Sequence, residues 1–498
     1  MKKTRIICLL LALVLCLGAF VSCRDNGSNE EEEGENGGEL NFNGQEVRLC
    51  ISAHQSPECN FPAADIYTKG PDAANTNEVS KEVLERNAAA EESLGIKIVY
   101  IEKNLYYDAV IEDVKQIVMS GAKNSPDIYN NDCASLAYSM VSGYLWNVKN
   151  AGDDVENYFD FTAKGWYEEY IKGCTFNQDK YYMFAGDYFI DMIRMAWVIY
   201  VNNDILSANM DALSKWCKSV DDFYGFVADG FWDIDALAGM SAAVFTEGAA
   251  GELGVTEKTD TTVGFAYVGN SNWAFSAGSG ITVYYLDENY NPKVMQDTTD
   301  FQLVANKFQN LQKTQGVYFQ QETKSATECF LQGNYLFAIS RLGEMESQEL
   351  RNFGASKGIV PIPMWNAREQ DNYITTVHDQ VEIGAILNTA QNFSAASALM
   401  QFLNEESDAV VYAYYEKGLK FKYNDDANNR MMMDLVRDTV GSPFGFQIGD
   451  HCEALYQGAG TIERLYITNT KISSTYAQWK DAYNDCMAKM IERFKELP

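Results

Sequence analysis

From residue 45 onward, apolar residues recur with two different periods, one typical of strands and one typical of helices. Residues 45–51 alternate apolar and polar side chains, which predicts a strand. The pattern also predicts strands over residues 96–101 and 125–129, and amphipathic helices over residues 77–94 and 107–120. Gly95 and Gly121 follow the two helices, and glycine is a common C-terminal cap. Strand, helix, strand, helix, strand is typical of a parallel sheet, so the predicted fold class is α/β.

Later segments predict further elements of both kinds. Residues 180–184 and 195–201 are apolar enough for buried strands, and residues 281–295 predict a hairpin that turns at 287–292. Asp233 or Asp235 is the expected N-cap of a helix. Two strong helical patterns cover residues 394–415 and 476–494.

Polar side chains follow two of the predicted parallel strands. His54 and Gln55 come shortly after the first strand, and Asn131 and Asp132 follow the third. Ligands of open parallel sheets bind beyond the carboxyl ends of the strands. We therefore expect these four side chains to lie near a ligand.

The first residues are predicted to form a targeting segment that is not part of the folded domain. A basic start leads into an apolar run over residues 6–20, and Ser22 precedes Cys23. The run is too short for an ordinary membrane-spanning helix and is typical of a secretory leader that ends in a lipobox-like cysteine. A lipobox usually has Leu three residues before the cysteine, where this chain has Phe20. Residues 1–22 are therefore predicted to be a lipoprotein signal peptide, or else an ordinary leader followed by an incidental cysteine.

Acyl chains such as palmitate on Cys23 would hold the mature chain on the outer face of a cell membrane. Residues 23–43 are acidic, rich in glycine and nearly free of apolar side chains, so we expect a disordered tether. No later segment is apolar enough to span a membrane, and the remaining length suffices for two lobes. The formal charge is −31, or −34 without the three basic residues of the leader, which argues against nucleic acid as a partner.

The sequence contains no local signature of catalysis or of a cofactor. It has no GxSxG, HExxH, Walker or dinucleotide motif, and its three histidines are far apart, so we expect neither a metal nor a cofactor. The turn at 287–292 resembles a calcium loop, but Pro292 stands where that loop needs glycine. Eight cysteines outside the leader and Cys23 permit disulfides, although scattered spacing favours buried thiols.

Aromatic residues make up 13% of the chain and suit sugar binding, because flat rings pack against the apolar faces of sugars. Trp273, Tyr188 and Trp365 follow loop-forming residues and are the candidates for such stacking. For each of them, packing in the core is an equally good interpretation.

Four segments carry a family resemblance: Lys180–Phe184 with Trp197–Asp204; Gly230–Leu237; Gln332–Phe337 through Pro361–Pro363; and Tyr373–Asp379 with Ala413–Glu416. Their order and spacing resemble the extracellular solute-binding proteins, family 1 type, of carbohydrate ABC transporters, and the last pair is similar to a clostridial lipoprotein branch. The resemblance covers about residues 44–494.

The resemblance implies a periplasmic-binding-protein-like (type II) fold, in which hinge strands join two α/β lobes around a central ligand cleft. Residues 44–202 plus 377–430 would form the first lobe, and residues 203–376 plus 431–498 the second. His54, Gln55, Asn131 and Asp132 would line the cleft from the first lobe. The matching positions on the second lobe are Trp273, Ser340 and Arg341.

The implied function is that of a monomeric receptor without catalysis, which captures an oligosaccharide and passes it to the permease subunits of an ABC transporter. Two alternatives remain open. One is a surface-tethered enzyme that degrades glycans, because glycosidase carboxylates come from distant strands and leave no local motif. The other keeps the fold but binds a peptide or a polyamine.

Overall fold

The computed structural model describes residues 40–52, 67–70, 78–105, 108–175, 179–247, 261–268, 271–320, 326–377, 381–419, 427–441 and 472–497. Residues from Leu40 onward pack as one unit. The predicted signal peptide, Cys23, His54 and Gln55 lie outside the described residues.

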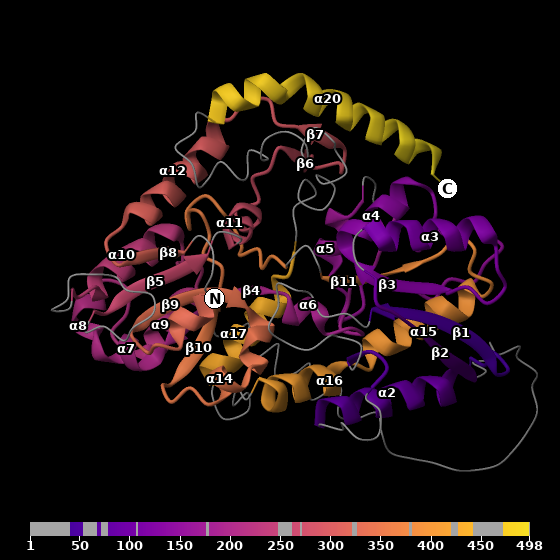
Figure 1. Ribbon diagram of the computed structural model, residues 1–498, viewed down its shortest axis with the longest axis horizontal. Helices are drawn as coiled ribbons and strands as arrows, with labels where there is room; N and C mark the ends of the chain where they lie inside the picture. The colour runs from indigo at the N-terminus through magenta and orange to yellow at the C-terminus, as the bar shows by residue number, and fades with distance from the viewer. Residues whose placement is uncertain are drawn as a thin grey trace, which may run out of the picture. The chain divides into compact units, whose positions relative to one another are not determined.

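A four-stranded sheet organises the first lobe (Figure 1). It contains β1 (Gln45–Ser52), β2 (Ile96–Lys103), β3 (Ile128–Asp132) and β11 (Glu382–Ile386) in the order β11-β3-β1-β2. β1 is parallel to β2 and β3, which confirms the predicted α/β class, whereas β11 is antiparallel to β3. β3 begins three residues later than predicted, after Pro126, which has no N–H to donate to a neighbouring strand.

Helices cover this sheet. α2 (Glu78–Leu94) packs against α15 (Phe393–Glu405) and α16 (Asp408–Ala413), and α3 (Asp108–Ser120) packs against α4 (Cys133–Val141). Gly95 and Gly121 both have φ +58°, the left-handed conformation expected of a C-terminal cap. The helix predicted over 394–415 is interrupted at residues 406–407, where the Ser407 hydroxyl donates to the Leu403 carbonyl. A π-turn, Tyr414–Gly418, ends this region.

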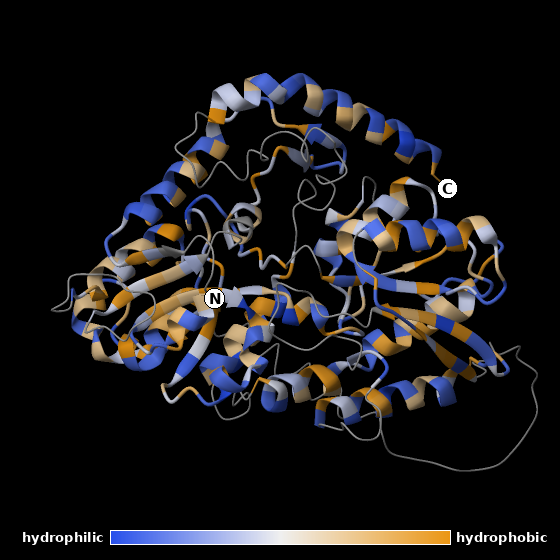
Figure 2. Cartoon of the chain, viewed as in Figure 1, coloured by the Kyte–Doolittle hydropathy of each residue, from blue (hydrophilic) through white to orange (hydrophobic). Residues whose placement is uncertain are grey.

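A five-stranded sheet organises the second lobe. Its order is β10-β4-β9-β5-β8, from β4 (Trp197–Asn202), β5 (Val263–Val268), β8 (Val317–Gln320), β9 (Tyr335–Arg341) and β10 (Lys357–Pro361). β9, β5 and β8 are parallel, while β4 is antiparallel to both β9 and β10. Apolar residues concentrate in the strands of both sheets (Figure 2), as expected where helices cover them.

Most of the helices described in the second lobe are short, although α12 (Thr299–Lys313) has 15 residues. They are α7 (Asn203–Ala208), α8 (Met210–Leu213), α9 (Val220–Ala228), α10 (Ile234–Val244), α11 (Asn272–Gly278), α12 (Thr299–Lys313), α13 (Ala326–Phe330), α14 (Gln348–Arg351) and α17 (Ala427–Asp438). Asp233 is the N-cap of α10 and accepts from the N–H of Ala236 at 2.8 Å, so the first of the two predicted caps is the one used.

The predicted hairpin is present as β6 (Tyr284–Leu286) and β7 (Pro292–Val294). Asp287 Oδ1 accepts from the N–H groups of Asn289 and Asn291, both at 2.9 Å, so this carboxylate organises the turn. Residues 180–184, in contrast, form no strand, although Lys180 and Phe184 are isolated bridge residues and Phe184 pairs with Gly384. A final helix, α20 (Ile472–Glu496), is longer than the pattern predicted.

Two segments connect the lobes side by side. Ala196 forms an isolated bridge with Val377, and the N–H of Trp197 donates to the Thr376 carbonyl at 2.9 Å. β4 itself, up to Asn202, pairs within the five-stranded sheet. The residue at which each lobe begins and ends stays a prediction.

The described cysteines are mostly buried thiols. Five are free, namely Cys50, Cys133, Cys174, Cys217 and Cys329, whereas Cys486 is in a disulfide whose other half lies outside the described residues. Burial raises the pKa of Cys50 to about 12 and that of Cys217 to about 11, so neither is a reactive thiolate. Over the part of the chain that the structure describes, no helix combines the length and the apolar character needed to cross a membrane.

Candidate ligand-binding site

The end of β3 places three consecutive polar side chains in the interior. Asn130, Asn131 and Asp132 are each at most 1% exposed. Asp132 caps α4, because its two carboxylate oxygens accept from the N–H and the hydroxyl of Ser135 at 2.8 and 2.7 Å. Within the part of the chain that the structure describes, the side-chain amide nitrogens of Asn130 and Asn131 have no hydrogen-bond partner. A buried donor left unpaired costs about 1–3 kcal/mol, so these two amides are candidate donors to a bound water or, where the surrounding residues open, to a ligand.

Polar groups continue from β3 toward the second lobe. Glu382, the first residue of β11, pairs in register with Asp132. The N–H of Glu382 donates to Asp191 Oδ2 at 3.2 Å, and Asp191 begins the short helix α6 (Asp191–Arg194). The end of β3 is therefore connected through β11 to α6.

Arg194 extends this connection to the five-stranded sheet. Its fully buried guanidinium lies 3.2 Å from Asp191 Oδ1 and 2.8 Å from Glu346 Oε1. Glu346 closes the 3₁₀ turn Leu342–Glu346, which directly follows β9. Two tyrosines donate to the same carboxylate, Tyr414 at 2.7 Å and Tyr67 at 3.3 Å, and the Tyr67 ring lies 4.7 Å from the guanidinium carbon.

The electrostatic environment of Asp191 favours a structural role for this side chain over a role in proton transfer. Burial raises the pKa of Asp191, Arg194 opposes that rise, and Glu346 adds to it. Each Asp191 oxygen already accepts a hydrogen bond, one from Arg194 and one from the backbone of Glu382. Asp191 therefore fixes α6 against β11, and both of its oxygens are occupied by these hydrogen bonds.

The predicted residues of the second lobe lie at the end of β9. Arg341 forms an ion pair with Glu344 at 3.0 Å, and its guanidinium lies over the Trp197 ring at 5.4 Å. The Ser340 hydroxyl lies 3.2 Å from that of Thr327. Since Glu344 balances the charge of Arg341, this position does not offer a net positive charge to a ligand.

The predicted aromatic candidates differ in their environments. Tyr188 is fully buried, with its ring packed against Trp166, Phe184 and Phe189, and its hydroxyl lies 3.5 Å from Asn130 Oδ1. Core packing is therefore the interpretation that fits the Tyr188 ring. Trp365 is also buried. Trp273 lies in the first turn of α11, and its side chain is outside the described residues.

The sequence reasoning missed Tyr67, Asp191, Arg194, Glu346 and Glu382. A signal did exist for two of them, because Asp191 and Arg194 are opposite charges three residues apart within an otherwise apolar segment, which is typical of a buried pair. Their partner Glu346 is 152 residues from Arg194 and could not be found in this way. Among the described residues, no three His, Cys, Asp or Glu side chains are grouped as metal ligands.

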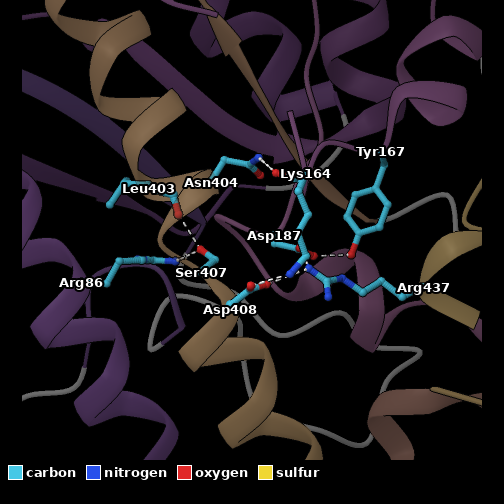
Figure 3. Close-up of polar contacts among 9 residues, drawn as sticks. All are labelled: Arg86, Lys164, Tyr167, Asp187, Leu403, Asn404, Ser407, Asp408 and Arg437. Atoms are coloured by element: carbon cyan, nitrogen blue, oxygen red, sulfur yellow. Dashed lines mark hydrogen bonds and ion pairs between the residues drawn. The ribbon is translucent and has the colours of Figure 1, made fainter. Parts of the chain in front are cut away.

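A second charged cluster contains Lys164, Asp187, Asp408 and Arg437 (Figure 3). Arg437 of α17 forms an ion pair with buried Asp187, and the Tyr167 hydroxyl donates to the same carboxylate at 2.7 Å. Asp408 pairs with Lys164 and lies 3.5 Å from Arg437. Lys164, Asp408 and Arg437 line a cavity of about 390 Å³, together with the tyrosines at residues 412 and 415. Both cations are paired, so the cluster joins α17 to the first lobe.

Figure 3 also shows how Arg86 holds α2 to this region. Its guanidinium donates to the Tyr188 carbonyl at 2.9 Å, to the Ser407 hydroxyl at 2.8 Å and to the side-chain oxygen of Asn87. Burial lowers the pKa of Arg86 to about 10, and the group stays charged at neutral pH. The backbone around Tyr188 is thus fixed from two sides.

Neither a family model nor a curated protein matches the sequence. Solved structures do match. The GacH receptor of Streptomyces glaucescens GLA.O, studied unliganded and with acarbose, aligns over 89% of this chain and 99% of its own, with TM-score 0.50 and 12% identity. A cyclo/maltodextrin-binding protein complexed with maltotetraose aligns over 91% and 97%, with TM-score 0.51 and 13% identity.

A third match is the galacto-N-biose/lacto-N-biose I-binding protein of the ABC transporter from Bifidobacterium longum, in complex with lacto-N-biose. It covers 90% of this chain and 98% of its own, with TM-score 0.50 and 12% identity. This chain has the two-lobe fold of these sugar-binding proteins. The expected periplasmic-binding-protein-like architecture is confirmed, and at such identities the likeness concerns the fold rather than individual site residues.

Proposed function

We propose that this chain is a receptor that captures an oligosaccharide outside the cell and delivers it to the permease of an ABC transporter. The observation that carries the proposal is a pair of buried, unpaired amide donors, Asn130 and Asn131, at the carboxyl end of a parallel strand in this fold. Sugar hydroxyls accept such hydrogen bonds. The three matched proteins, each described as bound to or studied with an oligosaccharide, add support.

The ligand would lie between the lobes. We propose that His54, Gln55, Asn131 and Asp132 contact it from the first lobe, with Tyr188 supporting Asn130 from behind. Trp273, Ser340 and Arg341 would face it from the second lobe, and the ion pair with Glu344 would hold Arg341 in place. Contacts shared by both lobes stabilise the closed form only when ligand is present, and the permease would recognise that form.

Binding without catalysis is the function that the described carboxylates favour. Asp132 caps α4, and Asp191 accepts from two groups, so both are occupied in holding the fold. Incubation with oligosaccharides followed by chromatography separates receptor from enzyme, because only a glycan-degrading enzyme would leave shorter products.

A thermal-shift screen tests the ligand class. The panel contains maltotetraose, acarbose and lacto-N-biose, together with a short peptide and a polyamine. Ligand at 100 times its dissociation constant stabilises the folded state by about 2.7 kcal/mol, which is easily measured. A rise in melting temperature with a sugar alone supports the proposal. A rise with the peptide or the polyamine alone would refute the carbohydrate assignment.

We further propose that the receptor is a monomer held on the outer face of the cell membrane by lipid on Cys23. Replacing Cys23 with Ser removes the acylation site, so the protein should move from the membrane fraction to the medium. A Cys16→Ser variant, altered within the leader, is the matched control and should stay with the membrane. Equal membrane association of both variants would contradict the lipid anchor.

A further inference from the structure

The last helix has one buried stripe along its full length. α20 is 25 residues long, or about 37 Å at 1.5 Å per residue. Its buried residues recur at intervals of three, four or seven and so share one face; they are Ile472, Tyr476, Tyr483, Met487, Met490 and Phe494. A stripe this long implies contact with the protein at both ends of the helix.

The N-terminal half of α20 is docked on the second lobe through the β6–β7 hairpin. The Tyr476 hydroxyl donates to the Met295 carbonyl, and Lys480 Nζ donates to the carbonyl of Gln296 at 2.9 Å. The rings of Tyr483 and Tyr284 meet edge to face at 6.0 Å. The hairpin leads directly into α12, which packs on α10 and β8 of the five-stranded sheet.

The C-terminal end of α20 is docked on the first lobe. The Phe494 ring meets the Tyr182 ring edge to face at 5.5 Å, and Lys180 Nζ donates to the carbonyl of Leu497. The segment that holds Tyr182 is attached to the four-stranded sheet, because Phe184 forms an isolated bridge with Gly384 of β11. α20 also contacts α4, which follows β3, and Figure 1 shows the helix running from the side of β7 to the side of α4.

We propose that α20 is a strap that limits how far the two lobes can separate. The helix is stiff over its length, so it cannot stretch when the lobes move apart. One docking site must then release. Three hydrogen bonds and an aromatic pair hold the N-terminal half, whereas the last turns, beyond the disulfide-bonded Cys486, are held by contacts that include the Phe494–Tyr182 pair and the Lys180 ammonium on the Leu497 carbonyl. Opening of the receptor thus requires one end of α20 to undock, which we assign to these last turns.

The inference deepens the proposed function, because it concerns the motion that would admit the ligand. It is tested in ligand-free protein, so its outcome does not depend on the sugar assignment. Phe494→Ala removes the aromatic contact, and Lys489→Ala, at an exposed position of the same helix, is the matched control. A truncation that removes residues 491–498 eliminates the whole C-terminal docking site without touching the core of either sheet.

Small-angle X-ray scattering measures the radius of gyration, and hydrogen exchange measures the docking of α20. We expect both strap variants to have a larger radius of gyration than the wild type and the control. Amides of residues 486–490 should exchange at least about tenfold faster, the factor that corresponds to a loss of about 1.4 kcal/mol in local stability. Circular dichroism with a single thermal transition verifies that each variant is folded. If either folded variant shows faster exchange in α20 but scatters like the wild type, the helix merely frays and the strap is refuted.

Discussion

The buried charge network around Arg194 makes a strong prediction about stability. Arg194→Met keeps a long apolar side chain at the site but removes the guanidinium that faces Asp191 and Glu346. Both carboxylates are then left in the interior without their cation. Breaking a buried ion pair by removing one partner costs about 3–5 kcal/mol. We expect a loss in that range, since Met fills much of the volume while the contact with the Tyr67 ring is also lost.

The pH dependence of this loss follows from the direction of the Asp191 shift. Burial already raises the pKa of Asp191 in the folded protein, and removal of Arg194 takes away the group that opposes the rise. A carboxyl whose folded pKa exceeds its unfolded value binds its proton more tightly when folded. As the pH falls through the folded pKa toward the lower unfolded pKa, the variant is therefore stabilised, by at most about 1.4 kcal/mol per pH unit for each proton. The difference in unfolding free energy between the variant and the wild type should become smaller as the pH falls from 7.5 toward 5.

Urea unfolding followed by circular dichroism measures both effects. Arg368→Met, at an exposed arginine, is the matched control and should change the unfolding free energy by less than about 0.5 kcal/mol. Adding Glu346→Gln to Arg194→Met should recover part of the lost unfolding free energy, because the second substitution removes one of the two buried carboxylates left without a cation. A loss below 1 kcal/mol that is equal at both pH values would refute the reasoning.

Three further predictions concern the site and the packing. Asn131→Ala should weaken oligosaccharide binding about tenfold in calorimetry, because its amide nitrogen has no partner among the described residues, and should also lower the melting temperature, because its side-chain oxygen accepts from the N–H of Asp132 at 2.8 Å; unchanged affinity would remove it from the site. Gly264→Ala should lower the unfolding free energy by about 1–3 kcal/mol, since a Cβ there would lie 2.2 Å from the α10 backbone. The control Gly225→Ala has open space and should not destabilise; equal effects would contradict the packing argument. Asp187→Asn should lower the unfolding free energy by about 1.5–3 kcal/mol, because it weakens the bond to Arg437. An unchanged urea midpoint would show that this ion pair does not contribute to stability.

Much of the local structure follows from short stretches of sequence. The helix ends at Gly95 and Gly121, the cap at Asp233 and the β6–β7 hairpin were predicted, because each depends on side chains within a few residues. The strand predicted over 180–184 failed for the opposite reason. Its apolar residues are buried by aromatic neighbours and by one bridge to β11, and burial alone does not require a ladder of strand hydrogen bonds.

The candidate site was only partly accessible from sequence. The position of Asn131 and Asp132 at a strand end was predicted because the carboxyl end of a parallel strand can be located from its pattern, and their role in binding stays a prediction. The chain of contacts from Glu382 to Glu346 was not, because it depends on the register of β11 against β3 and on α6 reaching the end of β9. Such long-range contacts do not recur at a regular interval along the chain, so no sequence pattern reveals them.

The sequence by itself determined the α/β class, the order of the first elements and the polar residues at the strand ends. These properties depend on periodicity and capping, which act over one or two turns of chain. Tertiary structure decided which charges are neutralised and which segments are tied together. Arg194 meets Glu346 across 152 residues, and α20 contacts both lobes, because only the packed chain brings distant groups within hydrogen-bond distance.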